Sequence, residues 1–215
     1  MTTLYWGPHT CAIGIHVLLE EIGAPYNTVQ LDAAGGDTHK PPFSILNPKN
    51  KVPTVVRDDQ SVLTEYGAIA RWLAYAHPEA GLLPQDREDE IRAQEMMDYA
   101  VGTVHAQGYA RIFMPARFEP DDPVHAALGL GAANVKAQGK AMVEKGLGIL
   151  DSALGQREWA GGGAFGIADT ALFYVERWAP QSGIHLPPAL AGHLARMKAR
   201  PAVRRVMAIW GEPVD

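Results

Sequence analysis

The amino-acid sequence predicts a small α/β domain followed by an all-helical domain. Two observations indicate this fold class. Short apolar strands alternate with helical patterns only in the first third of the chain, and the remainder is helical with no convincing strand. Between the two parts, residues 79–86 contain Gly81 and Pro84, which are typical of a linker. We therefore expect one domain over residues 1–78 and a second over residues 87–215.

The elements of the first domain follow an order that defines its fold. Short apolar runs bounded by Gly, Pro or polar turns predict strands, and apolar residues at helical spacing predict helices. In chain order we expect a strand over 4–6, a helix over 11–22 that stops at Gly23, a strand over 26–31, a polar loop over 32–40 within a connection that is a loop or short helix, hairpin strands over 54–57 and 61–63, and a helix from residue 65. This order matches a thioredoxin-like fold.

The second domain is expected to contain helices only. The expected helices cover residues 88–113, 123–154, 167–179, 188–199 and 202–210. The second of them is rich in glycine, namely Gly129, Gly131, Gly139, Gly146 and Gly148. Each glycine inside a helix costs up to about 1 kcal/mol relative to alanine. We therefore expect either close packing against another helix or a break in this segment.

The composition restricts the class of protein. The chain has 215 residues and a net charge of −5, which argues against nucleic acid or an anionic membrane as its main partner. No apolar run approaches the roughly 20 residues that a membrane span needs, and the N-terminus shows no signal-peptide pattern. The single cysteine, Cys11, excludes an internal disulfide and a CxxC metal site. We expect a cytoplasmic globular protein that uses no metal.

Pro53 stands directly in front of a predicted core strand. Proline has no N–H and cannot serve in the middle of a sheet, so its position needs a reason. A cis bond between Val52 and Pro53 would direct the backbone N–H and C=O of Val52 outward, where a peptide ligand can pair with them as an added strand. Farther along the chain, Glu65 opens a helix whose first N–H groups can hold a carboxylate.

This segment resembles the glutathione-binding motif of the glutathione S-transferases, in which a cis-Pro follows Val and an acidic residue precedes Ser at a helix start. Val52, Pro53 and Glu65 match this motif, and Tyr66 stands at the Ser position. Residues 4–11, Leu-Tyr-Trp-Gly-Pro-His-Thr-Cys, are similar to the Beta-class bacterial enzymes. The resemblance covers essentially the full chain. It implies an N-terminal glutathione-binding domain and a helical domain that lines the co-substrate pocket.

The first catalytic candidate is Cys11, at the N-terminus of the first helix, where Beta-class enzymes place their active-site Cys. There the helix dipole lowers a thiol pKa below its free value of about 8.5, and Thr10 is the expected N-cap. The alternative for Cys11 is a small buried hydrophobic residue. Tyr5 matches the first of two Beta-class tyrosines, Trp6 replaces the second, and Gly7 stands at the position of a catalytic Ser. The groups that remain near a glutathione sulfur are therefore those of Cys11 and Thr10, together with the Tyr5 hydroxyl if that side chain turns toward the sulfur.

The second catalytic candidate is His105, which lies at about the spacing of the His that Beta-class enzymes direct at the glutathione thiol. A neutral imidazole can accept a proton or donate a hydrogen bond to a thiolate. The alternative is an exposed or core-capping histidine. In the family the helix of His105 lines the pocket of the hydrophobic co-substrate, to which we assign Tyr109 and Phe113, together with Trp6 and His9. Core packing is the alternative for the aromatic residues.

Glutathione carries two carboxylates and one amine, so the resemblance implies charged and backbone anchors. Glu65 would face the amine, and the Tyr66 and Gly67 amides at a helix N-terminus would hold the γ-glutamyl carboxylate. Tyr66 in place of Ser removes one hydrogen bond, worth about 1–3 kcal/mol. Lys51, or else His39, would meet the glycyl carboxylate. The alternative for each of these two residues is a solvated surface charge.

The resemblance thus implies a homodimeric glutathione transferase. Glutathione would be its co-substrate, and the thiolate would attack a hydrophobic electrophile or reduce a peroxide. An alternative is a thiol–disulfide oxidoreductase that depends on Cys11. A second alternative is a non-catalytic binding or scaffold protein on the same fold, which the replacement of Ser by Tyr66 favours.

Overall fold

The N-terminal part of the chain forms a four-stranded sheet in the order β2-β1-β3-β4. The computed structural model describes residues 1–119, 124, 128 and 131–213. The strands are β1 (Thr2–Trp6), β2 (Tyr26–Gln30), β3 (Thr54–Val56) and β4 (Val62–Thr64). β1 and β2 are parallel, whereas β3 runs antiparallel to both β1 and β4. The predicted order of strands and helices in this domain is confirmed, with boundaries that differ by two residues or fewer.

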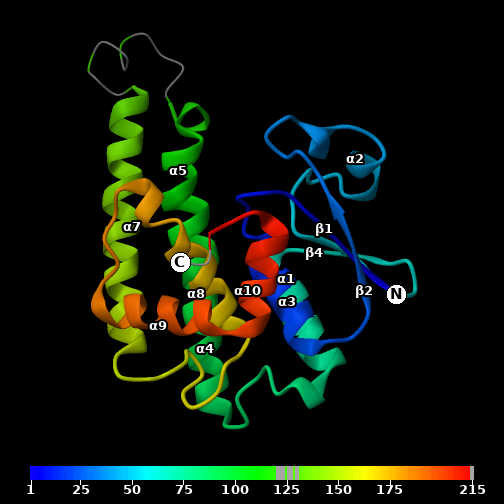
Figure 1. The fold of residues 1–215 in the computed structure, drawn as a ribbon. Coiled ribbons are helices and arrows are strands. Elements are labelled where there is room, and N and C mark those ends of the chain that lie inside the picture. The colour runs from blue at the N-terminus through cyan, green and yellow to red at the C-terminus, as the bar shows by residue number, and fades with distance from the viewer. Residues whose placement is uncertain (120–123, 125–127, 129–130, 214–215) are drawn as a thin grey trace.

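Helices connect and cover this sheet. They are α1 (Ala12–Ile22), the 3₁₀ turn η1 (Asp37–His39), α2 (Phe43–Leu46) and α3 (Tyr66–Ala76). α1 ends as predicted at Gly23, which takes a left-handed φ of 70° and donates its N–H to the Leu19 carbonyl. Figure 1 shows α1 and α3 between the sheet and the remaining helices, with α2 on the side of the sheet away from them.

The rest of the described chain is helical apart from loops and one isolated bridge between Trp159 and Gly162. Its elements are η2 (Pro78–Ala80), α4 (Arg87–Tyr99), η3 (Ala100–Tyr109), α5 (Ala110–Phe113), η4 (Pro115–Arg117), α7 (Ala132–Leu154), α8 (Ile167–Arg177), η5 (Pro180–Ser182), α9 (Pro188–Ala199) and α10 (Pro201–Trp210). The predicted helices are confirmed except at the start of the second, where α7 begins at Ala132 after an extended Gly131 and not at the predicted residue 123. Gly129 lies outside the described residues.

One predicted helix has an unexpected winding. The sequence predicts a continuous α-helix over residues 88–113, but the ten residues of η3 are wound as a π-helix. A π-helix closes i→i+5 hydrogen bonds, is rare, and often occurs at functional sites. Because the extra residue per turn rotates the following side chains around the axis, η3 changes which side chains face the first domain.

Glycines in α7 allow it to pack closely against η3 and α5. A Cβ atom on Gly139 would lie 2.8 Å from both the Gly108 carbonyl oxygen and the Arg111 Cβ, and one on Gly146 would lie 2.7 Å from a Val104 methyl. The expectation of close helix packing is therefore confirmed, and these glycines are required by contact rather than by conformation. Gly148 differs, because a Cβ there would meet nothing within 4 Å.

α8 runs through the centre of the helical part, and residues 167–176 of it are buried. Its N-cap is Gly166, and Asp169 accepts the Gly166 N–H at 2.7 Å. A Cβ at Gly166 would lie 2.6 Å from the Leu82 carbonyl oxygen, which explains why no hydroxyl residue stands there. Asp169 also accepts the Ala160 N–H at 2.7 Å, so it holds the preceding loop as well as the helix.

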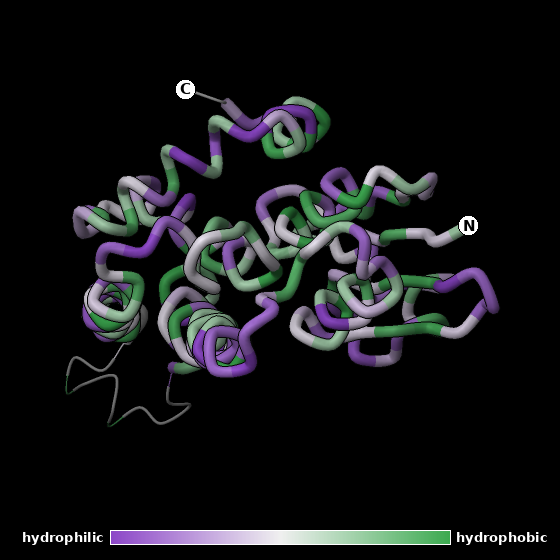
Figure 2. Tube along the Cα trace, turned by 90° about the horizontal axis from the view of Figure 1, so that it is seen from below, coloured by the Kyte–Doolittle hydropathy of each residue, from purple (hydrophilic) through white to green (hydrophobic). Residues whose placement is uncertain are grey.

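Apolar and polar residues alternate along the helices in Figure 2, so each helix has apolar residues to bury against its neighbours. The resulting core is continuous from Leu4 and Val55 in the sheet through α1 to Phe173 in α8 and Trp210 in α10. Within the described residues, no helix is long and apolar enough to cross a membrane.

Candidate functional site

Two adjoining cavities lie where the first domain meets the helices. The larger is a cleft of about 510 Å³, and the smaller has a volume of about 150 Å³. We call them the cleft and the small cavity. The residues that line both are Cys11, Lys51, Val52, His105 and Ala106. The two catalytic candidates, Cys11 and His105, therefore stand at the junction although 94 residues separate them.

The small cavity is bounded by the turn before β3. The Val52–Pro53 bond is cis, as predicted, and both residues line the cavity. The side-chain amide of Asn47 donates to the Lys51 carbonyl at 2.9 Å and to the Thr54 hydroxyl at 2.8 Å, and that hydroxyl donates to the same carbonyl. These bonds hold the backbone on each side of Val52, so the turn presents a fixed edge to a ligand.

Glu65 lies at the far end of the small cavity, directly before α3. It has a φ of 72°, which is strained for a residue other than glycine and typical of functional sites. The Lys49 ammonium donates to the Glu65 carboxylate at 2.7 Å and to the Thr64 hydroxyl at 2.9 Å. The sequence interpretation did not include Lys49, and no motif distinguishes it from the other lysines of that loop.

Tyr66 turns its hydroxyl away from this end of the small cavity. The side chain is buried, and its hydroxyl bonds to the Thr170 hydroxyl of α8 at 2.8 Å. Its ring approaches that of Tyr174 at 5.1 Å. Tyr66 therefore offers its backbone rather than its hydroxyl to a ligand, and the hydrogen bond of a Ser at this position is not replaced. Gly67 follows in α3 and does not line either cavity.

Cys11 is a buried, neutral thiol. Its Sγ lies 3.8 Å from the Val52 carbonyl oxygen, and only 8% of the residue is exposed. Burial raises the pKa of the Cys11 thiol to about 12, against the weaker opposing effects of a backbone N–H and of Arg177. The expectation of a lowered thiol pKa is therefore wrong, because the loss of solvation outweighs the helix dipole at this position.

Thr10 supports this helix start without being its N-cap. The N-cap position is that of Cys11. The Thr10 hydroxyl donates to the Gly7 carbonyl at 2.7 Å and accepts the Ala12 N–H at 3.3 Å. Thr10 lines the cleft but not the small cavity.

His105 projects from the π-helix η3 into the junction. Its Nδ1 lies 3.3 Å from the Tyr174 hydroxyl, and its ring meets the edges of Tyr174 and Trp178 at 5.4 and 5.0 Å. Burial, and then the charge of Lys51, lowers the pKa of His105 to about 4. The imidazole is therefore neutral near pH 7, and it can accept a proton or donate a hydrogen bond.

The cleft has an apolar part and a basic part. The apolar residues include Phe113, Met114, Phe118 and Trp178, and the basic ones are His9, His39, Lys51 and Arg117. His9 has a φ of 60° and an exposed side chain. Of the residues assigned to the co-substrate pocket, His9 and Phe113 line the cleft.

Besides Gly67, three aromatic residues that were assigned to the site line neither the cleft nor the small cavity. The Tyr5 ring packs against Phe43 at 5.6 Å, and Tyr5 lines a separate cavity beside α2. Trp6 is in the core, stacked on Trp210 at 4.3 Å. Tyr109 is fully buried, with its hydroxyl donated to the Val175 carbonyl at 2.8 Å. Tyr5 and Trp6 point to opposite faces of the sheet because they are consecutive in β1. Neither residue lines the cleft.

Arg177 fixes the loop before Cys11, and sequence reasoning missed it. Its side chain is buried at the end of α8, donates to the Thr10 carbonyl at 2.9 Å and pairs with Glu212 at 2.6 Å. Glu212 in turn lies 3.8 Å from His9 Nδ1. Arg177 thus joins the loop before Cys11 to the C-terminal segment, across 167 residues of sequence that no local pattern connects.

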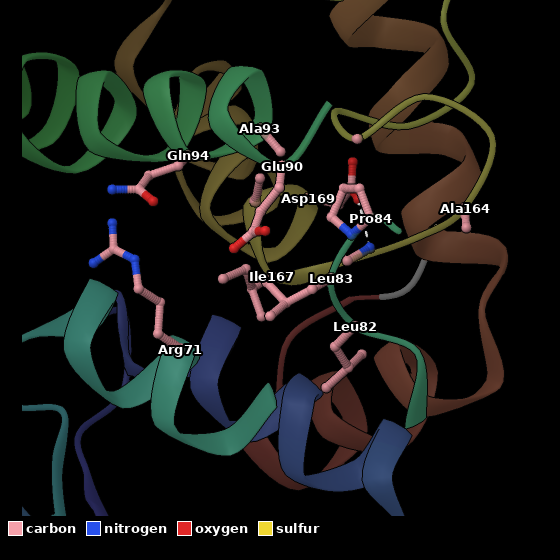
Figure 3. A pocket seen from close by; sticks show the side chains of 13 residues that line it. Arg71, Leu82, Leu83, Pro84, Glu90, Ala93, Gln94, Ala164, Ile167 and Asp169 are labelled. Atoms are coloured by element: carbon pink, nitrogen blue, oxygen red, sulfur yellow. Dashed lines mark hydrogen bonds between the residues drawn. The ribbon is translucent and has the colours of Figure 1, made fainter. Parts of the chain in front are cut away.

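Figure 3 shows a different cavity, of about 20 Å³, between α3, α4 and the loop before α8. The side chains of Arg71 and Gln94 point toward each other at one side, to the left of the apolar side chains of Leu83 and Ile167. This volume holds about one water molecule, and none of the predicted site residues lines it. Among the described residues, no group of three or more His, Cys, Asp and Glu is arranged to hold a metal ion.

Known proteins share this fold. Residues 10–76 match the family model described as glutathione S-transferase, N-terminal domain. The chain is 30% identical to glutathione S-transferase GstA of Escherichia coli O157:H7, over 97% of this chain and 98% of that protein. It matches a glutathione transferase homologue from Sulfitobacter with bound glutathione at a TM-score of 0.88 and 27% identity, over 97% and 98% of the two chains. A bacterial beta-class enzyme from Sphingomonas chungbukensis matches at a TM-score of 0.79 and 27% identity, over 97% and 98% of the two chains. The chain therefore belongs to the glutathione S-transferase family.

Proposed function

We propose that this transferase conjugates the thiolate of glutathione to a hydrophobic electrophile, as a cytoplasmic homodimer. The observation that carries the proposal is the junction at Cys11 and His105, where a cavity suited to a peptide meets a cleft with apolar walls. We also propose that residues 1–78 form the glutathione-binding domain and residues 87–215 the helical domain, with 79–86 as linker.

Glutathione would lie in the small cavity with its cysteinyl backbone paired to Val52. In support, the Val52 N–H donates to no group in the described part of the chain. The γ-glutamyl carboxylate would meet the N-terminal amides of α3, and its amine would meet Glu65. Lys51 would receive the glycyl carboxylate, because it borders both cavities, or else His39, which lines the cleft.

The chemical step needs a glutathione thiolate. The thiol would lose its proton to solvent or to the neutral His105, and the sulfur would then form a bond to the electrophilic carbon as the leaving group departs with its electron pair. Cys11, protonated because burial raises its pKa, would donate its S–H to the thiolate as a hydrogen bond. A donor aimed at developing charge in a water-poor site favours the charged form.

Two measurements test the proposal. The purified protein should bind glutathione in calorimetry and should conjugate it to 1-chloro-2,4-dinitrobenzene. A protein that does neither is the non-catalytic binding or scaffold protein of the alternative interpretation, and the proposal is then wrong. Sedimentation at several protein concentrations tests the proposed homodimer.

Replacement of Cys11 by Ser separates conjugation from thiol–disulfide exchange. A serine hydroxyl still donates a hydrogen bond, so conjugation should be retained within about tenfold, whereas it cannot form a mixed disulfide. If wild type reduces a mixed glutathione disulfide efficiently and Cys11→Ser loses that activity, the oxidoreductase alternative holds. The high pKa of the buried thiol argues against it, because the thiolate is the nucleophile in exchange.

A further inference from the structure

The apolar part of the cleft can exclude water from the ring of a bound ligand. Trp178 is almost fully buried and meets the edge of Phe113 at a centroid distance of 5.5 Å. Phe113 and Met114 are nevertheless 45% and 38% exposed, so they offer apolar surface that a ligand can cover. Burial of apolar surface contributes about 25 cal/mol per Å². This part of the cleft therefore favours a ligand with an aromatic or aliphatic portion.

The polar part of the cleft is basic. Lys51 and Arg117 line it together with His9 and His39, and no Asp or Glu is found among its described lining residues. The chain as a whole has 24 acidic residues against 19 Lys and Arg. An excess of basic groups in the cleft of an acidic protein therefore reflects the position of particular residues and not the composition.

Lys51 and Arg117 have no carboxylate among the described residues to neutralise their charge. Within the described part of the chain, no acidic group lies at ion-pair distance from Lys51 or Arg117, whereas the nearby Lys49 pairs with Glu65 at 2.7 Å. Glu212 lies 3.8 Å from His9 but is already paired with Arg177 at 2.6 Å. The cleft thus keeps positive charge that a bound molecule can complement.

Arg117 is the cation left for the electrophile. In the proposed function Lys51 takes the glycyl carboxylate of glutathione. Arg117 belongs to η4, directly after Phe113 and Met114, so its guanidinium and the apolar wall come from one short segment. Arginine pairs with carboxylates through two parallel hydrogen bonds, which gives orientation as well as attraction.

We infer that the preferred electrophile of the cleft is an apolar molecule that carries an anionic group, such as a carboxylate or sulfonate, which pairs with Arg117. This inference rests on the proposed function and names its substrate class. The apolar body packs on the wall that includes Phe113 and Trp178, and the anion stays near the basic mouth.

Two electrophiles with the same ring test the inference on the full-length protein. In 4-chloro-3-nitrobenzoate and 4-chloro-3-nitrobenzamide, the glutathione thiolate forms the C–S bond, chloride leaves with the electrons of the C–Cl bond, and the thiol proton goes to solvent. Each kcat/KM is divided by the uncatalysed rate constant, because the two rings differ in reactivity. We expect the normalised value to be about tenfold higher for the benzoate at low salt, with the preference falling as salt is added.

Arg117→Gln should remove most of this preference. Arg111→Gln is the matched control, since Arg111 lies six positions earlier, does not line the cleft, and is held over the Phe118 ring at 4.5 Å and by the Gln107 carbonyl. In the control the ratio should change by less than about twofold. A wild-type ratio of one or less, or an equal loss in both variants, overturns the inference.

Binding of unreactive analogues keeps this result separate from the proposed function. Calorimetry with 3-nitrobenzoate and 3-nitrobenzamide needs no turnover. If 3-nitrobenzoate binds more tightly than 3-nitrobenzamide, and this difference depends on Arg117, the inference is supported. If the same protein conjugates nothing, the proposed reaction is overturned. Conjugation of both electrophiles without a preference supports the proposed function and overturns the inference.

Discussion

Alanine in place of Gly139 is expected to weaken the contact between α7 and the segment that carries the cleft residues. A Cβ there would lie 2.8 Å from the Gly108 carbonyl oxygen and 2.8 Å from the Arg111 Cβ. Neither is the end of a flexible side chain, so α7 has to move away from η3 and α5. Overpacking of this kind costs about 1–3 kcal/mol.

The helix itself gains from the same substitution. Alanine is better than glycine in a helix interior by about 0.8–1 kcal/mol, so the net loss in the free energy of unfolding for Gly139→Ala is about 0–2 kcal/mol. Gly148→Ala is the control, because it lies in the same helix and its Cβ would meet nothing within 4 Å. It should stabilise by about 0.5–1 kcal/mol. The difference between the two variants, about 1–3 kcal/mol, isolates the contact because the helix term cancels.

Urea denaturation of wild type and both variants at one protein concentration measures these values. In thermal unfolding the same difference amounts to about 2–4 °C per kcal/mol for a chain of this size. If Gly139→Ala proves as stable as Gly148→Ala, with an unchanged m value, then α7 and η3 are not in close contact at Gly139. That result would also remove the reason why glycine occupies this position.

Three further predictions follow from charged groups. Lys51→Ala should weaken glutathione binding in calorimetry by about tenfold or more, and an unchanged affinity would show that another cation holds the glycyl carboxylate. Glu212→Ala leaves the buried Arg177 guanidinium without its partner, so the free energy of unfolding in urea should fall by about 3 kcal/mol; a loss below about 1 kcal/mol would mean that the pair acts as an exposed one. Burial disfavours the charged form of His193, yet Glu176 raises the pKa of His193 to about 9. The stability that protonated His193 contributes is therefore complete below pH 6.5 and is lost as pH rises through 9, with a slope of at most about 1.4 kcal/mol per pH unit; urea titrations showing stability flat or rising over that range would contradict it.

Local patterns predicted most of the secondary structure. The helix expected over 188–199 has the bounds of α9, and the helix over 11–22 differs from α1 by one residue. These elements depend on apolar spacing and on stops such as Gly23, which act within a few residues. The π-winding of η3 was not predictable in this way, because the side chains of 100–109 are spaced as an α-helix would have them and the winding forms against α7 and α8.

The site was predictable where backbone geometry decides it. The cis bond before Pro53 and the helix start after Glu65 follow from short-range constraints and a recognisable motif. The orientation of Tyr66 was not predictable, because its hydroxyl bonds to Thr170, 104 residues away. The same holds for Arg177, whose partners lie in two distant segments.

The sequence by itself determined the order of the elements, the turn at Val52 and the placing of Cys11 at a helix start. Only the tertiary structure decided the state of that thiol, because burial by distant residues raises its pKa while the helix start that the sequence reveals would lower it. In the tertiary structure Tyr5 and Trp6 lie away from the cleft, Arg117 lines it, and Arg177 binds the Thr10 carbonyl in the loop before Cys11. Solvation and ion pairing depend on every neighbour in space, and a sequence pattern reports only the neighbours along the chain.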